Sequence, residues 1–133
     1  MGFWAKLFGR TKVKLPEDPG CWEYKNKLLI INKTRARELH SPGGAIRFEK
    51  GPLPYRVLVV HHSDFNVYSY ENKCAGCGNR LDPDDSGKGV VKCTFLGGAT
   101  YDASGKMLDT DKDMSIRTLP VDIEGDVITI RIK

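Results

Sequence analysis

The chain has 133 residues, which suits one domain, and its 40% hydrophobic and 29% charged residues are ordinary for a globular protein. It contains no apolar run of about 18 residues, no helix-turn-helix pattern and no basic stretch interleaved with aromatic residues, so we expect neither a membrane-spanning helix nor nucleic-acid binding. The net charge of +4 is uneven, because residues 1–50 carry 11 Lys and Arg against 5 Asp and Glu, while residues 51–133 carry 10 against 12.

An N-terminal arm at residues 1–20 is predicted to precede a β domain at residues 21–133. Within residues 1–14, aromatic and leucine side chains recur at helical spacing beside Lys and Arg, which makes a short basic amphipathic stretch. This stretch favours peripheral contact with a membrane surface or a partner, or packing on the chain's own domain. No apolar core with a cleavage site follows the start, so we expect a cytoplasmic location.

From residue 28 onwards, apolar or alternating runs separated by turn residues predict a series of strands. The expected strands are 28–31, 45–49, 56–61, 66–70, 90–93, an extended 116–119 and a closing hairpin of 121–123 with 127–132. Pro83 to Gly89 is predicted as a polar turn. Strands at intervals of about 8–12 residues without a long helical period favour an all-β antiparallel sandwich or small barrel.

Three cysteines, Cys74, Cys77 and Cys93, lie within 20 residues of one another. Without a secretion signal, clustered cysteines indicate metal or redox chemistry more often than structural disulfides. Cys74 and Cys77 form a Cys-x-x-Cys-Gly knuckle, in which two thiolates on one turn can hold a tetrahedral metal. A complete site of this kind needs a second such pair, and here Leu96 stands three residues after Cys93.

A fixed order of motifs runs along residues 66–133. It consists of Cys74, Gly78, a Val–Val–Lys–Cys strand at Val90–Cys93, Gly97, the aromatic–acid pair Tyr101–Asp102, a turn at Gly105 and the link Leu119–Val121 before the closing hairpin. This order resembles the Rieske-type ferredoxin family, and residues 38–65 match the preceding strands more weakly. The resemblance implies a Rieske-like antiparallel β-sandwich with a small cysteine-bearing loop subdomain.

In the Rieske family, two loops each bring one Cys and one His to a [2Fe–2S] cluster. Carried over position by position, the resemblance implies Cys74 and Cys93 as the cysteine ligands of the first and second loop. The places of the two histidines are taken by Gly76 and Leu96, whose side chains offer no ligand atom. The resemblance therefore implies an iron–sulfur cluster that is atypical or absent.

Few other residues are candidate ligands. His61 and His62 are adjacent, so on a strand they point to opposite faces, and at most one can approach the cysteine loops. His40 lies near a turn and is expected at the surface. Cys21 completes an all-cysteine set if the fold brings it to the other three.

The cysteines allow three states, and the sequence leaves all of them open. In the first, Cys74, Cys77 and Cys93 bind zinc or an atypical iron–sulfur cluster together with a further ligand. In the second no metal is bound, and the thiols are reduced or a disulfide joins Cys74 or Cys77 to Cys93. In the third they are buried structural cysteines without chemistry.

The function that the resemblance implies is that of an electron-transfer or accessory domain, a component of an oxidoreductase system that acts with a separate redox or scaffold protein. We expect no turnover by this chain alone, since the sequence contains no defensible nucleophilic catalytic set. The alternatives are a cluster-free Rieske-fold interaction module and a zinc-stabilised binding domain that uses the Cys-x-x-Cys-Gly knuckle.

If residues 1–14 anchor the chain to a surface, their deletion should abolish sedimentation with anionic liposomes, because they supply the apolar and electrostatic attraction. Cosedimentation of the full and truncated chains measures this. Binding that survives the deletion, or no binding by the full chain, would contradict the anchor.

Overall fold

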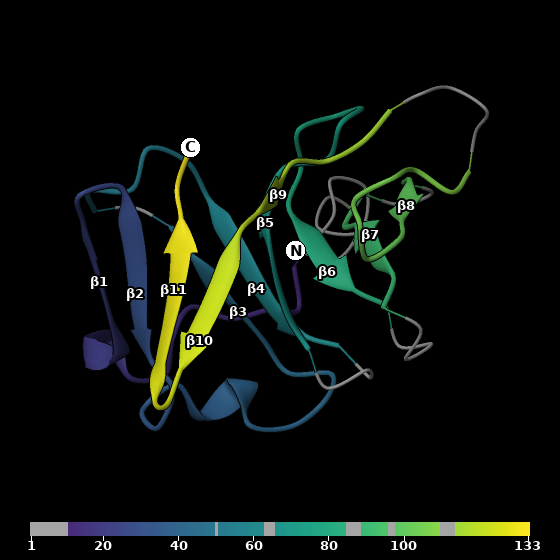
Figure 1. The fold of residues 1–133 in the computed structure, drawn as a ribbon. Coiled ribbons are helices and arrows are strands. Elements are labelled where there is room, and N and C mark those ends of the chain that lie inside the picture. The colour runs from purple at the N-terminus through teal and green to yellow at the C-terminus, as the bar shows by residue number, and fades with distance from the viewer. Residues whose placement is uncertain (1–10, 50, 63–65, 85–88, 96–97, 110–113) are drawn as a thin grey trace, which may run out of the picture.

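The computed structural model describes residues 11–49, 51–62, 66–84, 89–95, 98–109 and 114–133. Within these residues the chain forms antiparallel strands and two short 3-10 helices, η1 (Pro19–Cys21) and η2 (Arg37–Leu39) (Figure 1). None of the helices in the described part of the chain has the length and apolar character needed to span a membrane. The prediction of an all-β fold is confirmed.

Three sheets make up the fold of the described residues. Sheet A has the order β1 (Trp22–Lys25), β2 (Leu28–Asn32), β11 (Val127–Arg131) and β10 (Val121–Glu124). Sheet B has the order β3 (Ala45–Phe48), β4 (Val57–His61), β5 (Val67–Glu71) and β9 (Thr118–Leu119). Sheet C has the order β6 (Leu81–Pro83), β7 (Val91–Cys93) and β8 (Thr100–Tyr101).

Sheet A buries one face, as the alternation of its side chains dictates. Leu29 and Ile31 of β2 are fully buried, and they lie opposite Ile130 and Ile128 of β11, which are also fully buried. The residues between them point outwards and are at least partly exposed. This pattern aligns four aliphatic side chains on the face that meets sheet B.

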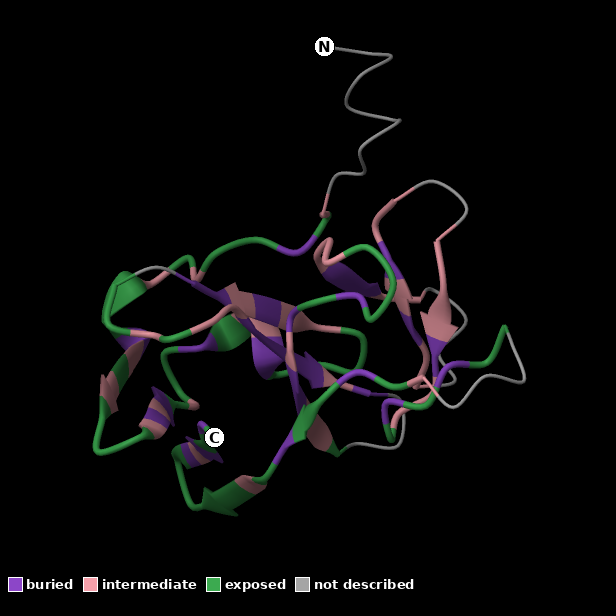
Figure 2. Cartoon of the chain, turned by 90° about the horizontal axis from the view of Figure 1, so that it is seen from above, coloured by how far each residue is buried: buried purple, intermediate pink, exposed green. Residues whose placement is uncertain are grey.

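Strand β4 explains how the layers stack, because every residue from Val57 to Val60 has no exposed surface. Val57 and Val59 belong to the core shared with sheet A, whereas Leu58 and Val60 belong to a second core shared with sheet C. An unbroken apolar run is the pattern of a strand covered on both faces. Sheet B is therefore the middle layer. Buried residues run through the interior of the molecule, and exposed residues lie on its outer loops and edges (Figure 2). Burial of each such side chain contributes roughly 1.5–3 kcal/mol.

Three strands were missing from the sequence prediction. Strand β1 is a short edge strand with two exposed charged residues, and β8 has only two residues, so neither has a clear apolar pattern. The prediction that a turn begins at Pro83 is wrong, because Pro83 ends β6 and pairs with Val91. Strand β6 lies at the edge of sheet C, where proline is tolerated because its missing N–H faces away from the ladder.

Residues 11–14 pack on the β domain. The Thr11 hydroxyl and the Lys12 N–H donate hydrogen bonds to the carboxylate of Asp82, and the side chain of Val13 is buried in the second core. Residues 1–10 lie outside the described residues, so the arm boundary after residue 20 and the membrane contact stay predictions. A deletion that tests the anchor without disturbing these contacts ends at residue 10.

An ion network connects sheet B to the segment that follows the cysteine knuckle. The guanidinium of Arg80 donates to both carboxylate oxygens of Glu49, at 3.0 and 2.7 Å, and Arg47 approaches the same carboxylate at 2.8 Å. The hydrogen bonds from Arg80 outweigh the effect of burial and lower the pKa of Glu49 to about 2. The network ties β3 to the start of β6.

Replacing Glu49 by Gln should lower the free energy of unfolding at neutral pH by about 1–3 kcal/mol, because two guanidinium groups lose the charge of the buried carboxylate that they share. The folded pKa of about 2 lies below the ordinary value of 4.5, so the stability from Glu49 is present above pH 4.5 and disappears as the pH falls towards 2. Chemical denaturation of both proteins across this range measures the effect. As a control, Asp18→Asn breaks the exposed Asp18–Arg35 pair and should matter much less. An equal loss in both variants would contradict the role of the network.

Candidate metal centre

The Cys-x-x-Cys-Gly knuckle follows β5 and forms a tight turn. The N–H of Cys74 donates to the carbonyl oxygen of Asn79 at 2.8 Å, and the N–H of Gly78 donates back to the carbonyl oxygen of Cys74 at 2.9 Å. Gly78 has a φ of +78°, in the left-handed region that residues with a side chain rarely adopt. The turn therefore depends on glycine after Cys77.

The second cysteine loop starts at Cys93, the last residue of β7, and brings its thiol to the knuckle. The sulfur atoms of Cys74, Cys77 and Cys93 all lie within 4.8 Å of one another, and those of Cys77 and Cys93 are 3.3 Å apart. All three thiols are free; Cys74 and Cys93 are buried and Cys77 is exposed. The fold thus brings together the three cysteines that the sequence predicted as ligands, and we call them the three-sulfur group.

Hydrogen-bond donors surround the sulfur of Cys74. The hydroxyl of Tyr101 lies 3.3 Å from this sulfur and accepts the N–H of Ala75 at 3.0 Å, which leaves its own hydrogen available to the sulfur. Burial raises the pKa of Cys74, but the Tyr101 hydroxyl and the backbone N–H groups of Cys77 and Gly76 outweigh it and lower the pKa to about 7. Cys74 is therefore the sulfur that this environment prepares as a thiolate.

The sulfur of Cys93 is held more tightly and is less acidic. The backbone N–H of Cys93 donates to the carbonyl oxygen of Ala99 at 2.8 Å, and the N–H of Phe95 donates to the sulfur of Cys93 at 3.4 Å. Burial raises the pKa of Cys93 to about 12. A Cβ at position 98 would lie 2.8 Å from the sulfur of Cys93, so only glycine fits beside this side chain.

Polar residues that the sequence reasoning missed hold the knuckle in place. The guanidinium of Arg56 donates to the carbonyl oxygens of Asn72 at 3.0 Å and Gly78 at 2.6 Å. The fully buried side chain of Asn72 accepts the N–H of Leu81 at 2.7 Å. No pattern in the sequence distinguishes Arg56 and Asn72 from polar residues at the surface. Tyr101 belongs to the aromatic–acid pair of the motif order, but the sequence did not predict it as a site residue.

Cys21 does not join the other cysteines. Its side chain is 1% exposed and lies in the core between sheets A and B, whereas the three-sulfur group lies at the second core. Burial raises the pKa of Cys21 to about 11. The alternative of an all-cysteine, four-ligand set is therefore wrong.

None of the three histidines belongs to the three-sulfur group, although all three lie in the described part of the chain. His40 is exposed, as expected, and His61 and His62 both use ring nitrogens in contacts away from the sulfurs. The contacts are His40 Nε2 to the carbonyl oxygen of Lys33 at 2.7 Å, His61 Nδ1 to the carbonyl oxygen of Leu39 at 2.8 Å, and His62 Nε2 to the hydroxyl of Tyr70 at 2.9 Å.

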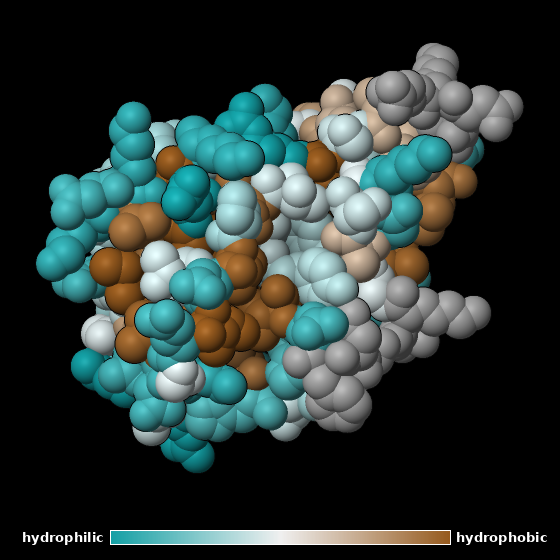
Figure 3. Space-filling view, viewed as in Figure 1, coloured by the Kyte–Doolittle hydropathy of each residue, from teal (hydrophilic) through white to brown (hydrophobic). Residues whose placement is uncertain are grey.

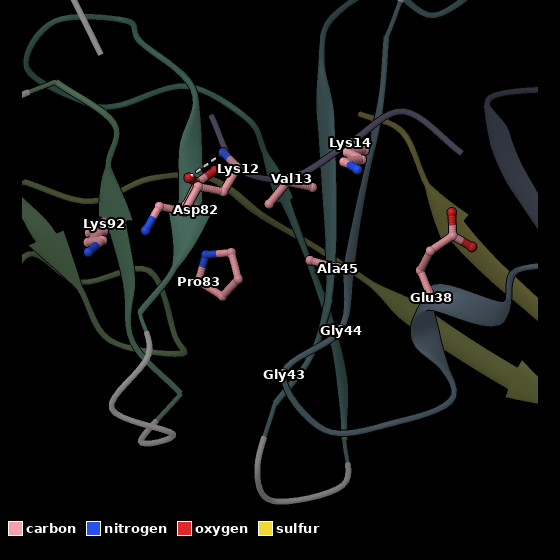
Figure 4. Close-up of a pocket in the computed structure, with 10 residues that line it drawn as sticks. All are labelled: Lys12, Val13, Lys14, Glu38, Gly43, Gly44, Ala45, Asp82, Pro83 and Lys92. Carbon is pink, nitrogen blue, oxygen red and sulfur yellow. Dashed lines mark hydrogen bonds between the residues drawn. The ribbon is translucent and has the colours of Figure 1, made fainter. Parts of the chain in front are cut away.

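Two other surface features lie apart from the three-sulfur group. A groove of about 360 Å³ runs between residues 12–14, the start of β3 and sheet C, and its lining includes Lys12, Lys14 and Lys92 but no described cysteine (Figure 4). Apolar atoms also gather over β10 and β11 of sheet A (Figure 3), where Ile123 and Val127 are 41% and 42% exposed. Neither feature contributes a ligand to the sulfurs.

Comparison with known proteins gave matches among solved structures alone. No family model and no curated protein matches the chain. The ferredoxin of carbazole 1,9a-dioxygenase from Nocardioides aromaticivorans is 21% identical with a TM-score of 0.57, over 70% of this chain and 88% of that one. The plasma membrane Rieske protein of the cyanobacterium Synechocystis is 19% identical with a TM-score of 0.52, over 65% and 85%. A chain from the complex of reduced oxygenase and oxidised ferredoxin in carbazole 1,9a-dioxygenase is 15% identical with a TM-score of 0.56, over 68% and 82%.

These likenesses establish the class: the chain has the Rieske fold, and the fold that the cysteine motifs implied is confirmed. The standard Rieske cluster needs two histidines on one of its irons. Position 76 is glycine, and a Cβ there would meet no atom of the described residues within 4 Å, so these residues leave open space where the first histidine would stand. Leu96, at the second histidine place, lies outside the described residues and has no ligand atom. The residues present do not fit a two-cysteine, two-histidine cluster.

Replacing Tyr101 by Phe should raise the pKa of Cys74, because the buried thiolate loses the hydroxyl that stabilises it. The pH dependence of the alkylation rate of the metal-free protein, with Cys74 alkylation followed by mass spectrometry, measures the shift. Tyr55→Phe serves as a control, since Tyr55 packs at the other core and its hydroxyl donates to the carbonyl oxygen of Lys133 at 3.0 Å. An unchanged pKa of Cys74 in Tyr101→Phe would contradict the assignment.

Proposed function

We propose that this chain is an electron-transfer or accessory domain of the Rieske-ferredoxin type, whose centre is a single thiophilic metal ion bound by Cys74, Cys77 and Cys93 in place of the usual cluster. The observation that carries the proposal is the closeness of the three sulfur atoms, which all lie within 4.8 Å of one another on two facing loops. With iron at this site the domain carries electrons for a separate protein.

The spacing of the sulfurs favours one metal ion over a cluster. Two thiolates on one tetrahedral metal at 2.3 Å lie roughly 3.8 Å apart. Thiolates on different irons of a cluster are farther apart, because the distance between the irons adds to their separation. The upper bound of 4.8 Å on all three sulfur pairs suits one ion with a fourth ligand from solvent or a partner.

The exposure of one sulfur supports an exchange of electrons with a partner. Cys74 and Cys93 are buried, but Cys77 is exposed, so one ligand of the proposed centre reaches the surface. The similar ferredoxin belongs to a dioxygenase, and the complex named above joins a ferredoxin to an oxygenase. We extend this from those proteins to the present chain and propose a separate redox protein as its partner.

A zinc-stabilised binding domain is the second candidate, and the knuckle geometry suits it equally. A tight Cys-x-x-Cys-Gly turn with backbone N–H groups directed at a cysteine sulfur is suited to zinc as well as to iron. Zinc has no redox chemistry, so with zinc the domain binds a partner and transfers no electrons.

Anaerobic purification, followed by elemental analysis for iron, zinc and acid-labile sulfide, decides between these candidates. One iron per chain without sulfide supports the proposed electron-transfer centre, and reversible reduction of that iron completes the case. Zinc alone supports the second candidate. A chain that binds neither metal, even after reconstitution under reducing conditions, would contradict both and leave an interaction module.

Removal of the metal with a chelator should lower the melting temperature of the purified protein, because the ion binds the folded chain and not the unfolded one. Cys74→Ser and Cys93→Ser should each lower the melting temperature by several degrees, since each substitution removes a buried sulfur that is a ligand of the proposed metal. Cys77→Ser is the matched control: at its exposed position it should lower the melting temperature of the metal-loaded protein and leave that of the metal-free protein unchanged. Melting that none of these changes affects would contradict a bound metal.

A further inference from the structure

The contact between Cys77 and Cys93 suits a second kind of chemistry besides metal binding. Their sulfur atoms are 3.3 Å apart, and both thiols are free. A disulfide has a sulfur–sulfur distance of about 2.05 Å, so the two atoms have to approach by only about 1.3 Å. They lie on two loops, 16 residues apart in sequence.

Cys77 is the cysteine that can make this approach. It is exposed, which gives an oxidant access to its sulfur. Gly76 and Gly78 flank it, and a Cβ built at either position has no described neighbour closer than 4.0 Å, so the turn has room to adjust.

Cys93 forms the fixed side of the pair. It ends β7, where it pairs with Leu81 of β6, and the backbone of Gly98 lies close against its side chain. Strand pairing and the close approach of Gly98 therefore restrict the movement of the Cys93 side chain. The sulfur of Cys74, by contrast, faces the hydroxyl of Tyr101 and is shielded from solvent.

We propose that Cys77 and Cys93 form a reversible disulfide, and that this bond releases the metal from the three-sulfur group. The oxidant is a small-molecule disulfide of the glutathione class. The Cys77 thiolate attacks it to form a mixed disulfide and displaces one thiolate; the Cys93 thiol then gives up its proton to solvent and attacks the Cys77 sulfur, which displaces the second thiolate. Two electrons pass from the two cysteines to the oxidant, which leaves as two thiolates.

Metal release follows from the loss of ligands and rests on the proposed function. Thiolates bind metals, and once two of the three are joined in a disulfide Cys74 alone keeps its charge. One thiolate replaces three, so the affinity for the metal falls. The metal site and the disulfide are therefore mutually exclusive states of the same sulfurs, which makes the centre sensitive to the thiol redox state of its surroundings.

The disulfide is tested on the metal-free chain, incubated with glutathione disulfide and mapped by mass spectrometry after digestion without reduction. The expected product joins Cys77 to Cys93 and leaves Cys74 free, with the buried Cys21 as an unreacted internal control. Cys77→Ser should give no intramolecular bond, and Cys74→Ser should still give the Cys77–Cys93 bond. A bond between Cys74 and either neighbour, or a mixed disulfide alone, would overturn the assignment.

Metal release is tested on the chain loaded with zinc, which is itself redox-inert, with a chromophoric chelator to report free zinc. Glutathione disulfide should lower the zinc affinity at least tenfold, and excess reduced glutathione should restore it. Full retention of zinc by chains in which the mapped disulfide has formed would overturn the coupling. A chain that never binds zinc or iron would overturn the proposed function and the coupling, while the map of the metal-free chain still decides the disulfide.

Discussion

Strand β4 is covered on both faces, and the rest of the structure depends on that constraint. Val57 and Val59 face sheet A, and Leu58 and Val60 face the cysteine-bearing side. No other arrangement removes four consecutive apolar side chains from water in an extended strand. The stack of three sheets follows, and it places the two cysteine loops on a fully buried support.

The three sulfurs differ in how firmly that support holds them. Cys74 and Cys93 belong to the second core, so their positions are set by packing. Cys77 stands at the tip of a turn that glycine flanks, and its thiol is exposed. Two fixed sulfurs and one accessible sulfur can hold a metal ion. Because Cys77 is exposed, an external oxidant can also reach the three-sulfur group. The metal chemistry and the thiol chemistry therefore arise from one geometric feature.

The part of the site that could be predicted from the sequence is local in character. The Cys-x-x-Cys-Gly spacing determines that two thiols share a turn, and the strand before Cys93 is visible as an apolar run. Tyr101, Asn72 and Arg56 escaped prediction as supporting residues because their contacts cross between segments far apart in the sequence. The buried Glu49 carboxylate escaped for the same reason, since its partner Arg80 lies 31 residues away.

The sequence by itself determined the strand pattern, the kinds of ligand atom on offer and the absence of histidine from both Rieske positions, because these depend on residue identity and short spacing. Only the tertiary structure decided which cysteines meet. Cys93 reaches the knuckle because its strand, β7, pairs with β6, the strand that follows the knuckle in the chain. Cys21 carries the same thiol group but is enclosed in the core between sheets A and B. The packing of sheets on the two faces of β4 determines which cysteines come together. That packing depends on the whole set of buried side chains and not on any one motif.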